Sequence, residues 1–215
     1  SFTWVKGLQD HGLTVFQAIL FRQTLGMAIF MPMIINSGFA PLRSPVPARH
    51  FYRSALGFLG MCTGYYSLSL INVADSVALQ FTLPIFTMFA AVLILGEKIR
   101  SHRVIATLIG FGGVLIIVRP GFTEVNLGIL FALSASAFHS VSDSLSRYLA
   151  RHDRHQTIMV LNFAFTIPLA AIPAIILWEP LSSDIWPPLI GFGLAGISAQ
   201  FCLTRSFGIA EASLV

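Results

Sequence analysis

The chain has 215 residues, of which 55% are hydrophobic and 10% are charged, and its mean hydropathy is +0.80. Soluble domains carry about 25% charged residues, because a surface in water needs charge whereas a surface in lipid is penalised for it. The composition therefore excludes a soluble module. The net charge of +4 does not indicate nucleic-acid binding either, because the basic residues lie in short loops between apolar runs.

Seven apolar stretches predict membrane-spanning helices, since about 20 apolar residues cross about 30 Å of hydrocarbon. In chain order these are residues 13–37, 54–72, 76–96, 104–118, 126–147, 157–178 and 185–204. The fourth is the shortest, at about 23 Å for a rise of about 1.5 Å per residue, and a buried helix that does not span is the alternative there. Residues 1–8 and 210–215 are expected to belong to further helices of a longer chain.

The distribution of basic residues gives an orientation. Alternate loops carry Arg43, Arg49 and Arg53, then Lys98, Arg100 and Arg103, then Arg147, Arg151 and Arg154. The positive-inside rule places such loops in the cytoplasm. We therefore expect a multi-pass protein of the plasma (inner) membrane, with 38–53, 97–103 and 148–156 inside and 179–184 outside.

The sequence also contains a weak internal repeat. A shift of 136 positions aligns Pro32 with Pro168, Gly57 with Gly193, and Gly60 with Gly196. The loops that follow the aligned segments 54–72 and 185–204 are then on opposite sides of the membrane. Two halves of opposite orientation are a common construction of secondary transporters, with the substrate site near the midplane between them.

Several motifs resemble a known family. They are Ala74-Asp-Ser-Val-Ala-Leu-Gln-Phe-Thr-Leu-Pro84, Leu95-Gly-Glu97 and Ile109-Gly-Phe-Gly-Gly-Val-Leu-Ile-Ile-Val118, with Arg22 in the first span. Together they resemble the EamA domain of the drug/metabolite transporter superfamily. The second half, at 196–204 and 210–213, is similar to its S-adenosylmethionine uptake-like group. The resemblance implies an all-α bundle of ten helices in two inverted five-helix repeats. The first would be 1–121, with its first helix cut short, and the second 122–215, cut after the start of its fourth helix.

Polar side chains inside the spans are the candidate site residues. His139, Asp143 and Arg147 recur every four residues and so share one helix face. Ionisable groups within a span usually face the bundle interior or a wet cavity, so His139 and Asp143 are expected to bind substrate or relay protons. The alternative is that Asp143 simply pairs with Arg147 near the cytoplasmic interface.

Other candidates follow from the same argument. Arg22 is expected to bind an anionic group such as a carboxylate, or else to pair with a neighbour and fix the fold. Pro84 frees the carbonyl of Gln80, which predicts either a broken-helix binding point or a packing kink. Tyr65 is expected to offer a ring contact. The amides of Asn162 and Gln200 would bind a ligand or form interhelical hydrogen bonds.

These features predict a secondary transporter that moves a small polar metabolite, amino-acid-like or nucleoside-like, by alternating access. The expected partners are the small-molecule substrate and membrane lipid, without nucleic acid. No residue cluster has metal-ligand spacing, and the glycines of 110–113 lack the Lys and Ser/Thr of a phosphate loop, so no metal or cofactor is expected. An intramembrane enzyme and a structural membrane protein without transport are the alternatives; we expect no catalytic activity, because the His139–Asp143 pair lacks a clear nucleophile.

Overall fold

The computed structural model describes residues 12–95, 101–118, 126–181 and 183–212, and this part of the chain is helical without β-strands. The helices are α2 (Val15–Asn36), α3 (Pro47–Leu70), α4 (Val73–Gln80), α5 (Leu83–Leu95), α6 (Ser101–Val118), α7 (Leu127–Ala150), α8 (His155–Ile176) and α9 (Trp186–Ala212), with 3-10 turns η1 (Ala40–Leu42) and η2 (Ser183–Ile185). The predicted all-α helix bundle is therefore confirmed.

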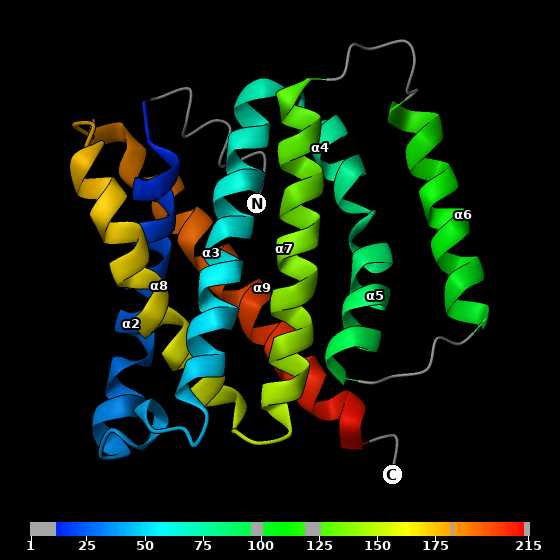
Figure 1. The fold of residues 1–215 in the computed structure, drawn as a ribbon. Coiled ribbons are helices and arrows are strands. Elements are labelled where there is room, and N and C mark those ends of the chain that lie inside the picture. Colours follow the sequence, from blue (N-terminus) through cyan, green and yellow to red (C-terminus); the bar gives the residue numbers. More distant parts are fainter. Residues whose placement is uncertain (1–11, 96–100, 119–125, 182, 213–215) are drawn as a thin grey trace.

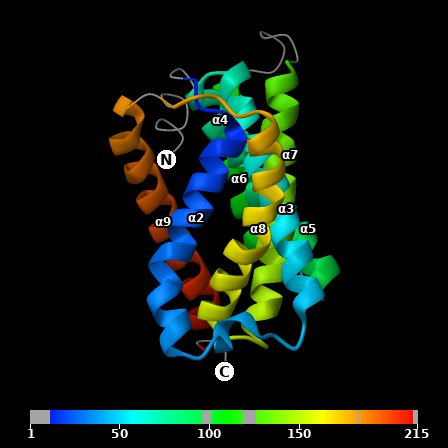
Figure 2. The same cartoon turned by 90° about the vertical axis from the view of Figure 1, so that its left-hand side faces the viewer.

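The helices lie side by side with their axes roughly parallel or antiparallel, and α9 crosses them at a slant (Figure 1). α3 and α7 form the centre and pack extensively on one another. α2 packs against both α8 and α9 on one side of this pair, as the turned view also shows (Figure 2). α4 and α5 pack against α7 on the other side, and α6 lies beyond them against α4.

Local sequence explains where several helices begin. Thr14 caps α2 through a capping box, in which its hydroxyl accepts from the backbone of Gln17 while the Gln17 side chain accepts from the backbone of Thr14. Asn126 caps α7 by accepting from Gly128 N. Pro47 occupies the first turn of α3, where a missing N–H costs nothing.

Four segments of the described chain are long and apolar enough to cross a membrane: Val15–Asn36, Val73–Ile94, His155–Ile176 and Trp186–Ser206. α3 and α7 have 24 residues each but are more polar. Their polar groups are buried at the centre, as for Arg53 and Ser144. Apolar residues on the peripheral helices face outward instead, and Leu93 is 85% exposed. This distribution suits a bundle surrounded by lipid.

The predicted helix 76–96 is not continuous, because it breaks between α4 and α5. Phe81 N and Thr82 N bond to the carbonyls of Ala78 and Leu79, three residues back, instead of four. Pro84 has no N–H to offer to the carbonyl of Gln80, so the regular ladder cannot pass this point. The chain therefore crosses here as two half-helices.

The predicted helix 104–118 is part of α6, and the buried alternative does not fit its position. Ile109 and Ile116 are more than 70% exposed. The glycines in between, Gly110, Gly112 and Gly113, have open space where a Cβ would be. Within the described chain these glycines therefore do not mediate the close helix packing that their pattern suggests.

The helices that the internal repeat aligns run in opposite directions. α2 runs downward in Figure 1 whereas α8 runs upward, and α3 runs upward whereas α9 runs downward. The segments 37–46 and 151–154 lie together at the lower end, which we call the cytoplasmic end after the positive-inside assignment. The segments 177–181 and 183–185 lie at the upper end. Glu97, Lys98 and Arg100 lie outside the described residues.

Candidate functional site

A cavity of about 460 Å³ lies at the centre of the bundle. Helices α2, α3, α7, α8 and α9 and the α4–α5 break all contribute to its wall. Its polar lining residues are Arg22, Arg53, Tyr65, Gln80, Ser136, His139, Ser142, Asp143, Asn162 and Gln200. The volume lies within the range of small-molecule sites, about 300–1,000 Å³, and charged groups of both signs face it.

Seven of the eight predicted site residues line this cavity, and the exception is Pro84. Pro84 is exposed on α5 and contributes by interrupting the helix, which leaves Gln80 at the end of α4 beside the cavity. Tyr65 is buried while its neighbour Tyr66 is exposed, so only one of the two faces inward. Tertiary packing thus gathers these side chains from segments far apart in sequence.

Arg22 reaches the cavity from α2. Its Nη1 donates to the hydroxyl of Tyr65 at 3.3 Å, and its aliphatic part lies against Gly196 of α9, where a Cβ would be 2.8 Å from Cδ. No described carboxylate forms an ion pair with Arg22. Arg22 therefore presents its charge to the cavity and retains donors for an anionic ligand.

His139 and Asp143 reach the cavity from α7. The Nδ1 of His139 donates to the carbonyl of Ala135 at 2.8 Å, which leaves Nε2 as the second ring nitrogen. The ring rests against Gly60 of α3 and so faces the other half of the bundle. Asp143 lies one turn further on, and the charges of His139, Arg53 and Arg147 all act on it. Arg147 is therefore one of several charged neighbours, whereas the alternative given above considered Arg147 alone.

Arg53 is a cavity residue that the sequence interpretation assigned to a loop. α3 begins at Pro47, so Arg53 lies in its second turn and is only 3% exposed. Its Nε donates to Ser146 Oγ, and its carbonyl accepts from Ser142 Oγ at 3.0 Å. Pro47 in a Pro-Val-Pro segment is a helix-start signal that would have moved the predicted helix boundary upstream.

The repeat-related glycines Gly60 and Gly196 occupy matching roles. Gly60 of α3 accommodates the imidazole of His139, and Gly196 of α9 accommodates the side chain of Arg22. In each case the ionisable residue comes from the opposite half of the chain. The absence of a side chain at these two positions is what lets both ionisable groups lie in the cavity wall.

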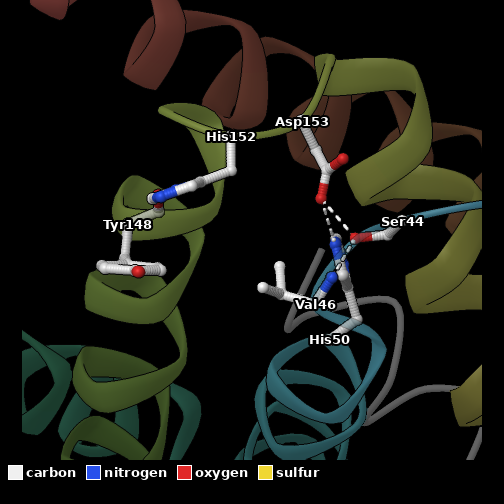
Figure 3. A network of polar contacts seen from close by, with 6 residues as sticks. All are labelled: Ser44, Val46, His50, Tyr148, His152 and Asp153. Carbon is white, nitrogen blue, oxygen red and sulfur yellow. Dashed lines mark hydrogen bonds and ion pairs between the residues drawn. The ribbon is translucent and has the colours of Figure 1, made fainter.

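A second polar cluster closes the cytoplasmic end (Figure 3). Asp153 Oδ2 accepts from Ser44 Oγ at 2.6 Å and lies 2.8 Å from Nε2 of His50, which is fully buried. Burial lowers the pKa of His50, and the bond to Asp153 offsets only part of that effect. The cluster joins the α2–α3 segment to the α7–α8 loop.

A bundle of outward-apolar helices around a charged, ligand-sized cavity is an arrangement that membrane transport proteins have. Residues 1–119 match the model of the EamA-like transporter family, which is more than half of the chain. The chain therefore belongs to the EamA-like transporter family, and it is an integral membrane protein.

Named relatives and a solved structure agree with this assignment. The chain is 25% identical to a protein named S-adenosylmethionine uptake transporter from Rickettsia prowazekii, over 92% of this chain and 67% of the relative. It is 27% identical to a protein named riboflavin transporter from Vibrio cholerae serotype O1, over 96% of this chain and 70% of the relative. A protein of known crystal structure shares the fold, with a TM-score of 0.68 and 21% identity over 96% of this chain and 75% of that protein.

Proposed function

We propose that the protein is a secondary transporter of the plasma membrane that moves a small polar metabolite by alternating access. The observation that carries this proposal is the central cavity, whose charged and amide side chains come from both halves of the chain. Sites between inverted repeats, with interrupted helices in the wall, are the usual arrangement of secondary transporters. The α4–α5 break beside Gln80 is such an interruption.

The proposed substrate is amino-acid-like or nucleoside-like. Arg22 can bind a carboxylate, Asp143 can bind a cationic group, and the amides of Gln80, Asn162 and Gln200 can hydrogen-bond a heterocycle. The relatives named for S-adenosylmethionine and for riboflavin support a metabolite of this size and polarity.

The proposed coupling group is His139. Histidine is the side chain whose unperturbed charge change lies nearest to physiological pH, and the ring of His139 lies between the two halves, against Gly60. A proton bound there changes the electrostatic attraction to Asp143 and the repulsion from Arg22, both of which act on the ring. Protonation can therefore favour one access state over the other.

Uptake into proteoliposomes tests the proposal. The full-length protein would be given labelled S-adenosylmethionine, riboflavin, amino acids and nucleosides, with and without a pH gradient. We expect saturable uptake of at least one of them, with a pH dependence that His139→Ala removes. Absence of flux for every compound under every gradient would refute the transporter, whereas wild-type pH dependence in His139→Ala would remove only His139 from the mechanism.

A further inference from the structure

Arg53 is a buried cation with an unsatisfied donor in the wall of the central cavity. Its Nη1 is shielded and has no hydrogen-bond partner, although its Nε is bound by Ser146. A buried donor of a charged group that lacks a partner decreases the stability of the folded protein. Arg53 has such a donor and also lines the central cavity. A ligand in the cavity would supply the missing acceptor once a small shift of the side chain uncovers Nη1.

Asp143 lies at a similar depth and faces the same cavity. Arg53 is six residues from the cytoplasmic start of α3 and Asp143 is seven residues from the cytoplasmic end of α7, which places both about 9–10 Å from that end. Arg22 is about 21 Å from the cytoplasmic end of α2. The two groups attract one another electrostatically but do not form a direct ion pair.

Arg53 is held in this position by the helix that carries Asp143. Ser146 accepts from its Nε and Ser142, the residue before Asp143, donates to its carbonyl. α3 is thereby fixed to α7 at the level of the two charges. A cation and an anion are thus presented side by side, one from each half of the chain, with ligand-accessible space next to both.

We propose that Arg53 and Asp143 form a receptor for the zwitterionic head of an α-amino acid. The carboxylate of the head accepts from the guanidinium of Arg53, and its ammonium donates to the carboxylate of Asp143. The planar guanidinium matches a carboxylate in geometry, and the two charges of the head compensate two buried charges that do not touch. The inference rests on the proposed transport function and narrows its substrate to compounds with a free α-amino and a free α-carboxyl group.

The remainder of such a substrate would extend toward the external half of the cavity. That region offers the amide of Gln200 and the guanidinium of Arg22 with its Tyr65 contact, whereas Asn162, seven residues from the start of α8, lies at about the depth of Arg53. Because the head bridges α3 and α7, its binding would tie the two halves together on the cytoplasmic side.

Ligand binding to the purified full-length protein in lipid nanodiscs tests the receptor. The probes are S-adenosylhomocysteine, which carries the head, and 5′-methylthioadenosine, which has the same nucleoside without it; riboflavin serves as a further compound without the head. We expect the wild type to bind S-adenosylhomocysteine more tightly than 5′-methylthioadenosine. Arg53→Gln should decrease the affinity for S-adenosylhomocysteine by about ten- to a hundredfold and leave the affinity for 5′-methylthioadenosine unchanged.

Three variants control the experiment. Arg49→Gln removes an exposed guanidinium one turn earlier on α3, which stacks on Tyr148 4.2 Å away, and should leave binding unchanged. Arg53→Lys retains the positive charge but loses the two parallel donors of the guanidinium. Its affinity for S-adenosylhomocysteine should lie between those of the wild type and Arg53→Gln. The double variant Arg53→Gln with Asp143→Asn removes both charges together, so neither is left without the other. It should therefore fold where a single variant fails, and should also lose the preference for the head.

The outcomes separate this inference from the transport proposal. Equal binding of S-adenosylhomocysteine and 5′-methylthioadenosine by the wild type would overturn the receptor, as would a failure to bind S-adenosylhomocysteine. An Arg53→Gln or double variant with wild-type preference for the head would overturn it as well. Uptake of riboflavin and of no other compound in proteoliposomes would support the transport function and refute the receptor for the amino-acid head.

Discussion

Replacing Gly60 by alanine should displace His139 from the cavity wall. An ideal Cβ at Gly60 would lie 2.6 Å from Cε1 and 3.1 Å from Cγ of the imidazole. Carbon atoms pack at about 3.5–4.0 Å, so the ring must move by about 1 Å. The atoms that clash include Cγ at the base of the ring, and Nδ1 is bound to Ala135, so the ring cannot simply swing aside.

The expected loss of stability follows from these contacts. Overpacking costs about 1–3 kcal/mol, and loss of the Nδ1 hydrogen bond adds about 0.5–1.5 kcal/mol. The better helix propensity of alanine returns up to about 1 kcal/mol. We therefore expect a net decrease of about 0.5–4.5 kcal/mol in the free energy of unfolding. A lower apparent Tm in thermal unfolding of the detergent-solubilised protein would report this decrease.

Gly110→Ala is the matched control, because a Cβ at that position meets no atom within 4 Å. It should keep or slightly raise the Tm, since only helix propensity changes. Uptake assays on the same samples should show an altered pH profile for Gly60→Ala alone. Equal Tm values and equal pH profiles for the two variants would refute the close packing of His139 on Gly60.

Three further predictions follow from other contacts. Arg22→Lys should reduce transport while leaving expression unchanged, because the guanidinium fork is lost; equal loss of folded protein in Arg22→Lys and Arg22→Ala would instead indicate a packing role. Cysteines at Glu179 and Arg43 should be labelled by a membrane-impermeant reagent only at Glu179 in intact cells, and the reverse pattern would invert the topology. His50 has a pKa below its ordinary value of 6.5, so its contribution to stability is complete above 6.5 and is lost as the pH falls through the lowered value. His50→Gln should therefore flatten the decrease of Tm between pH 7 and pH 5, and an unchanged slope would contradict this assignment.

Helix positions were predictable because hydrocarbon penalises charge at every depth, which leaves a pattern that composition alone reveals. The boundaries were less predictable. α3 begins seven residues before the predicted 54–72, since a helix that is buried by protein can contain His50 and Arg53. A hydropathy argument treats such residues as loop, although each of them forms a hydrogen bond inside the bundle, His50 with Asp153 and Arg53 with Ser146.

The break between α4 and α5 was foreseeable only in part. Pro84 predicts that one backbone hydrogen bond of the helix is missing. The residue at which the helix ends depends instead on which carbonyls accept from the backbone N–H groups before Pro84. Here Thr82 N and Thr82 Oγ1 both use the carbonyl of Leu79, which closes α4 before Pro84. Because these hydrogen bonds end α4 at Gln80, the side chain of Gln80 lies at the cavity.

The sequence by itself determined the helical class, the membrane environment and the polar residues worth testing, because each depends on the transfer of single side chains between water and lipid. Only the tertiary structure decided which of these residues meet. Arg22 and His139 both lie at the cavity because Gly196 and Gly60, which are far from them in the sequence, provide space between helices of opposite halves. Arg53 and Asp143 face the same cavity because α3 packs against α7, and the spacing of residues along one helix does not specify such packing.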